Sequence, residues 1–81
     1  MIQISDHARK AMDDDAISED EVNQCLDQGE LEIKQVVNGE MRYGKKLELK
    51  EKTIMVIYTH SDIDRIITTY VIRRKKWQQN T

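Results

Sequence analysis

The spacing of apolar residues changes at residue 30, from a helical period to a strand period. Before that point apolar side chains recur three and four positions apart, whereas "ELEIKQVV" and "EMRYGKKLELK" alternate apolar and polar side chains. Two later segments, "TIMVIYTH" and "RIITTYVIR", are almost continuously apolar, which is typical of strands inside a sheet. Helices followed by strands predict an α+β fold.

The first helix is predicted from its ends. Residues 1–4 form either a short strand or an extended lead-in. Ser5 or Asp6 then supplies the side-chain oxygen that caps a helix N-terminus. Three acids at 13–15 oppose the helix dipole at a C-terminus, so we expect the helix to end there.

A second helix is predicted over residues 18–28. Ser18 and Glu21 have the spacing of a capping box, in which each side chain accepts a free backbone N–H of the other residue. Gly29 follows at the position where a left-handed C-terminal cap is common.

Four strands follow the helices. Asn38 and Gly39 are the strongest short hairpin signal, and polar turns separate the later strands. We therefore predict a four-stranded antiparallel β-meander with two N-terminal helices packed on one face of the sheet. Residues 1–73 form this single domain, and residues 74–81 form a basic C-terminal tail.

Composition restricts the class of protein. The chain of 81 residues supports one core, which is aliphatic because phenylalanine is absent. Lone Cys25 cannot form an internal disulfide, so a reducing, cytoplasmic location is expected. The absence of an apolar stretch of membrane-spanning length predicts no membrane association. The charged edge strand at 30–37 favours a monomer.

Charge is divided unevenly along the chain. Residues 1–32 carry ten acids and two bases, whereas residues 33–81 carry eleven bases and five acids. This division suits an anionic partner on the C-terminal half, although a solvated charged face explains it equally well.

Few residues have the character of a catalytic group. His7 stands in the first turn of a helix, whose positive end favours the neutral imidazole that can act as a base; a hydrogen bond to a strand is the structural alternative. Cys25 lies on an apolar helix stripe and is expected in the core. His60 is explained as an exposed turn residue. Alternation places Tyr70 on a strand face with Thr68 and Ile66, where its ring can stack on a base or lie at the edge of the core.

The segments "ISDHARKAM", "AISEDEVNQCLDQGELEI", "GEMRYGKKLEL", "TIMVIYTH" and "RIITTYVIR" together resemble a prokaryotic family of uncharacterised small domains. That family's pattern is a Ser-x-His-Ala start, an Ile-Ser opening of the second helix, a Leu-x-x-Gly close and a final Thr-x-Tyr strand. More remotely, the chain is similar to the RelE and BrnT toxins, which are small α+β ribonucleases of toxin–antitoxin systems. The family arginine before the methionine of the first helix is replaced here by Ala11.

The resemblance implies a metal-independent ribonuclease that needs no cofactor and binds RNA on a basic sheet face. It implies catalytic roles for His7, Arg42 and Tyr70, with RNA and an antitoxin protein as partners. The nucleic-acid-binding residues that it implies are Arg9, Lys45, Arg65 and Arg73. A non-catalytic domain of the same fold that binds a protein or a nucleic acid is the alternative.

Overall fold

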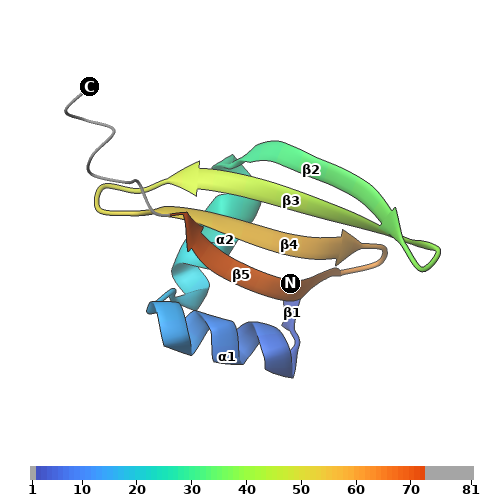
Figure 1. The fold of residues 1–81 in the computed structure, drawn as a ribbon, viewed down its shortest axis with the longest axis horizontal. Coiled ribbons are helices and arrows are strands. Elements are labelled where there is room, and N and C mark those ends of the chain that lie inside the picture. The colour runs from blue at the N-terminus through green and yellow to red at the C-terminus, as the bar shows by residue number, and fades with distance from the viewer. Residues whose placement is uncertain (1, 73–81) are drawn as a thin grey trace.

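Both predicted helices form, and they lie on one face of a single sheet (Figure 1). The computed structural model describes residues 2–72. In chain order the elements are β1 (Ile2–Ile4), α1 (Asp6–Asp15), α2 (Glu19–Gln28), β2 (Glu30–Val37), β3 (Glu40–Glu48), β4 (Thr53–His60) and β5 (Asp64–Ile72). The α+β class and the two-layer arrangement are confirmed.

The sheet has five strands rather than the predicted four, in the order β1-β5-β4-β3-β2. The last four strands pair antiparallel, but β1 pairs parallel with β5, with Ile2 beside Asp64 and Ile4 beside Ile66. Of the two alternatives for residues 1–4, the short strand is the one that forms. Its parallel pairing makes the sheet mixed, so the prediction of a four-stranded antiparallel sheet is wrong. A parallel pair joins segments distant in sequence, so no hairpin signal marks it.

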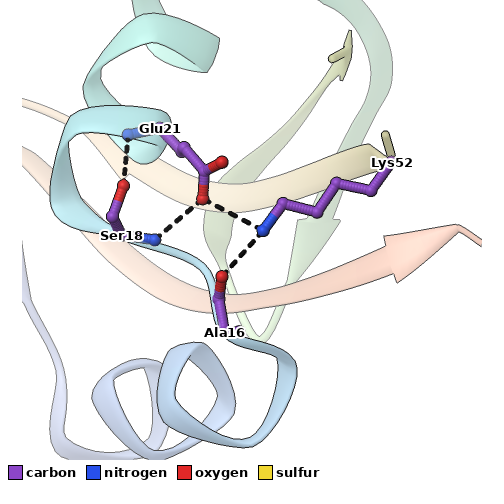
Figure 2. Close-up of polar contacts among 4 residues, drawn as sticks. All are labelled: Ala16, Ser18, Glu21 and Lys52. Atoms are coloured by element: carbon purple, nitrogen blue, oxygen red, sulfur yellow. Dashed lines mark hydrogen bonds and ion pairs between the residues drawn. The ribbon is translucent and has the colours of Figure 1, made fainter. Parts of the chain in front are cut away.

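The capping box of α2 is present, and a lysine of the β3–β4 turn extends it (Figure 2). Ser18 Oγ accepts the Glu21 N–H at 3.1 Å, and Glu21 Oε1 accepts the Ser18 N–H at 2.9 Å. Lys52 Nζ donates to the Ala16 carbonyl at 2.7 Å and lies 3.1 Å from Glu21 Oε1. This lysine thereby ties the connection between the helices to one end of the sheet.

Gly29 does not have the predicted left-handed conformation. Its φ is −71°, whereas Ala16 at the end of α1 has φ 55° and is the left-handed cap. Glycine is needed at position 29 for space, because an added Cβ would lie 2.5 Å from the Cys25 carbonyl oxygen and 2.9 Å from that of Lys46. Close packing of α2 on β3 therefore explains this glycine.

Two β-bulges interrupt the strict alternation of side chains that the sequence suggests. One falls between Leu31 and Ile33, so that these two residues lie on opposite faces of the sheet. The other shifts the β4–β5 register so that Ile66, which is fully buried beneath the helices, no longer shares a face with Thr68 and Tyr70. The predicted grouping of Tyr70 with Ile66 is therefore wrong.

The core lies between the helices and the sheet and is mainly aliphatic, as predicted. Its buried members are Ala8, Met12, Ile17, Val22, Cys25, Ile54, Val56, Tyr58 and Ile66. Ile17 and Val22 flank the start of α2, where their burial fixes the direction in which the chain enters that helix.

Candidate functional site

The sheet face opposite the helices, here called the open face, carries a polar row that crosses every strand. Arg42 lies beside Thr59, since the next residue, Tyr43, pairs with Tyr58; Thr59 itself pairs with Arg65. This arginine row consists of Gln35, Arg42, Thr59, Arg65 and Gln3. It brings two of the predicted site residues, Arg42 and Arg65, to either side of one hydroxyl group.

Most donors of these two guanidinium groups have no partner among residues 2–72. Arg42 Nε is buried without a hydrogen bond there and lies 3.6 Å from Glu40 Oε1, although the Arg42 side chain as a whole is 32% exposed. Arg65 is exposed and makes no hydrogen bond or ion pair within the described chain. Guanidinium groups bind phosphate and carboxylate through paired N–H donors, so the row can bind an anion.

Tyr70 lies on the same open face, away from the arginine row. It pairs with Met55, which is four residues from Thr59 along β4, or roughly 13 Å at the usual rise of a strand. Its side chain is partly free, since the residue is 40% exposed. Tyr70 can therefore contact the same extended ligand as Arg42, but not the same small group.

His7 and Arg9 belong to the other layer. Both are exposed on α1, which packs against the face of β5 that is opposite to the arginine row. Arg9 Nη1 forms an exposed ion pair with Glu19 Oε2 at 3.3 Å. The fold does not bring His7 together with Arg42 and Tyr70, so these three residues do not form one centre.

Lys45 is also on the helix-covered face. Its Nζ donates to the Leu26 carbonyl at the end of α2 at 2.6 Å and lies 5.9 Å from the centre of the Tyr58 ring. Part of its role is therefore to cap α2. Arg73 and the basic tail lie outside the described residues.

Sequence reasoning missed a pocket of about 320 Å³ on the helix-covered face of the sheet. It is lined by Leu31, Tyr43, Lys45, Tyr58, His60 and Asp64. His60 Nδ1 is hydrogen bonded to Asp64 Oδ1, and the Tyr43 and Tyr58 rings stack with centres 5.5 Å apart. Burial, followed by the charge of Asp64, raises the pKa of the Tyr58 hydroxyl.

One signal could have indicated this pocket. Tyr43 and Lys45, like Tyr58 and His60, are two positions apart on neighbouring strands, so each pair lies on one face. The tertiary structure decides which face these pairs share, and it leaves a pocket there to which neither helix contributes a lining residue.

The sequence model of one protein family matches residues 4–71, which is most of the chain. The chain belongs to this family, described as a domain of unknown function, DUF4258. No curated protein and no solved structure matches the chain. The resemblance to an uncharacterised family of small domains is thus confirmed, and none of the comparisons relates the chain to the RelE or BrnT toxins.

Cys25 of this DUF4258 domain is a core residue, as predicted. It is fully buried, and burial raises the pKa of its thiol to about 11, which disfavours the nucleophilic thiolate. Within residues 2–72 there is no group of three or more His, Cys, Asp or Glu placed to hold a metal ion. No helix in this part of the chain is long and apolar enough to cross a membrane.

Proposed function

We propose that the chain is an RNA-binding domain that holds RNA phosphates on the arginine row of the open face. The observation that carries the proposal is the placement of Arg42 and Arg65 on either side of Thr59, on a face that neither helix covers. Charge-assisted N–H donors and a hydroxyl group are the usual protein contacts of phosphate oxygens.

The length of the row favours an extended anion over a single small one. Five neighbouring strands at about 4.8 Å spacing give a row of roughly 19 Å. Gln35 and Gln3 at its two ends add amide groups, which bond equally well to phosphates, sugars and bases. The exposed ring of Tyr70 on the same face offers a surface on which an unpaired base can stack.

Single-stranded RNA suits this face better than a duplex. An open sheet face presents side chains to splayed bases and to the 2′-hydroxyl, whereas a duplex buries its bases and offers mainly its phosphates. The strands of the open face carry threonine as well as arginine, so hydroxyl groups are available at Thr59 and Thr68.

RNA cleavage is the second candidate function, and one contact favours it. The Glu40 carboxylate lies 3.6 Å from Arg42 Nε, so a potential proton acceptor stands beside the proposed phosphate site. In this proposal Glu40 takes the role that the resemblance implied for His7, because His7 lies in the helix layer.

The test is fluorescence anisotropy of a fluorescein-labelled single-stranded 12-mer RNA, with chelator present. We expect Arg42→Ala with Arg65→Ala to raise the dissociation constant about tenfold or more. The slope of the logarithm of the binding constant against the logarithm of the salt concentration should fall by the amount expected for about two phosphate contacts. The matched control, Arg9→Ala with Lys10→Ala, removes the same charge from α1 and should change the constant less than about threefold.

Equal losses in the two double variants would show binding by net charge alone and would overturn the proposal, as would a parent protein that fails to bind at low salt. Denaturing gels of the same mixtures test cleavage. Products from the parent protein that disappear in Glu40→Gln support a ribonuclease, whereas intact bound RNA supports the binding domain alone.

A further inference from the structure

The pocket on the helix-covered face is separate from the proposed RNA site. Its residues belong to β2, β3, β4 and β5, but their side chains leave the sheet on the side opposite to Arg42, Thr59 and Arg65. The thickness of the sheet therefore lies between the two sites, and the pocket calls for a ligand of its own.

A fixed cation forms one wall of this pocket. Lys45 Nζ is held by the Leu26 carbonyl at 2.6 Å and lies over the Tyr58 ring. An ammonium group has three donors, so two remain for an anionic ligand. Lys34, which is exposed and pairs with Tyr43 on the same face, places a second positive charge beside the pocket.

Flat and apolar groups form the other wall. The stacked rings of Tyr43 and Tyr58 line the pocket, and Leu31 is 51% exposed at its edge. Two further exposed apolar residues, Val36 and Met41, pair with each other on this face. Exposed apolar groups that gather around a pocket are typical of a binding site.

His60 and Asp64 complete the polar side of the pocket. His60 Nδ1 is hydrogen bonded to Asp64 Oδ1, so the second ring nitrogen, Nε2, is the one left to contact a ligand. The pocket therefore offers one ammonium group, one imidazole nitrogen and an aromatic wall.

We propose that this pocket binds a small aromatic anion, with its phosphate or carboxylate group on Lys45 and its ring against Tyr43 and Leu31. The volume of about 320 Å³ is at the lower end of the range that small-molecule sites occupy. A ligand with both a ring and a charge uses both walls, whereas a ligand with only one of them uses half of the site.

The test is an NMR titration of the ¹⁵N-labelled protein with four probes. Adenosine 5′-monophosphate and indole-3-acetate carry a ring and a charge, adenosine carries only a ring, and inorganic phosphate carries only a charge. We expect at least one of the first two to shift the amides of Tyr43, Lys45 and His60, with a dissociation constant about tenfold or more below those of adenosine and phosphate, a difference of about 1.4 kcal/mol. The tighter of the two identifies the anionic group.

Variants at and away from the pocket test whether the probes bind there. Leu31→Asp adds a repelling charge at the pocket edge and should weaken binding about tenfold, whereas Ile63→Asp, at another exposed apolar position in the β4–β5 turn, should leave it unchanged. Lys34→Gln, at an exposed position, and Lys45→Gln should both weaken binding; the first remains informative if the loss of the α2 cap unfolds the second.

The proposal is overturned if neither charged aromatic probe shifts the pocket amides at millimolar concentration. It is also overturned if phosphate or adenosine alone binds as tightly, or if Ile63→Asp weakens binding as much as Leu31→Asp. The double variant Arg42→Ala with Arg65→Ala should bind these probes like the parent, so the outcome is independent of the RNA proposal.

Discussion

The hydroxyl group of Ser5 donates a hydrogen bond to the carbonyl oxygen of Ile67 at 3.2 Å, across 62 positions of sequence. The hydroxyl oxygen of Ser5 also accepts the Ala8 N–H at 3.1 Å and so caps α1. Ile67 is the residue that the β4–β5 register omits, so its position in the bulge leaves its carbonyl free for this bond. One side chain therefore both starts the first helix and fixes it to the sheet.

Replacing Ser5 separates these two roles. Ser5→Ala removes both hydrogen bonds and should lower the free energy of unfolding by about 1–2 kcal/mol, while Ser5→Asp keeps the capping acceptor and loses only the donor to Ile67. Urea denaturation followed by circular dichroism should rank the parent first, Ser5→Asp second and Ser5→Ala last. An aspartate variant as stable as the parent would show that the bond to Ile67 contributes nothing.

The contacts of Lys52 with Ala16 and Glu21, here called the Lys52 clamp, should stabilise the connection between the helices. Lys52→Met keeps most of the side-chain length but removes the donor to Ala16 and the partner of Glu21, so we expect a loss of about 1–2 kcal/mol. For a domain of this size that loss lowers Tm by roughly 4–16 °C. The matched control is Lys50→Met in the same turn, since Lys50 is exposed and makes no hydrogen bond or ion pair within residues 2–72; equal Tm values for the two variants would contradict the role of the clamp.

Glu21 should make the free energy of unfolding depend on pH in the acidic range. The Ser18 backbone N–H, together with Lys52, holds the pKa of the Glu21 carboxyl below its ordinary value of 4.5. The folded protein therefore favours the carboxylate, and this contribution is present above about pH 4.5 and is lost as the pH falls through the lowered pKa. We expect Glu21→Gln to be less stable than the parent at pH 7, and the difference to shrink on acidification below pH 4.5. Urea denaturation at several pH values measures it, and a difference that grows on acidification would have the wrong sign.

Two glycines should tolerate alanine unequally. At Gly29 the new methyl group meets backbone oxygens of Cys25 and Lys46, which cannot move without shifting α2 from β3. At Gly44 the nearest atoms belong to the side chains of Ile33 and Ile57, each 2.9 Å away on the open face. We expect Gly44→Ala to cost about 1–3 kcal/mol and Gly29→Ala to cost more, as measured by thermal denaturation. The reverse order would show that the α2–β3 contact at Gly29 adjusts to an added methyl group more easily than the side chains around Gly44.

Local chemistry made much of this fold predictable from the sequence. Ser18 and Glu21 specify a helix start because their side chains reach backbone groups only three residues away. Asn38 and Gly39 specify a hairpin because both adopt the positive φ that its turn requires. The stripe that contains Val22 and Cys25 marked the buried side of α2 in the same way.

The placement of the candidate site residues depends on contacts between segments that are distant in sequence. The parallel pairing of β1 with β5, and the bulge that separates Ile66 from Tyr70, depend on contacts between distant segments that no local pattern records. In the assembled fold His7 lies in the helix layer away from Arg42, and Arg42 and Arg65 lie on either side of Thr59. His60 and Asp64 line a pocket to which neither helix contributes a residue. The two helices, the four later strands and the aliphatic core could be predicted because hydrogen-bonded caps, turns and periodicity act over a few residues. The functional groups that share a face could not be predicted, because one bulge or one added strand changes that assignment for a whole segment.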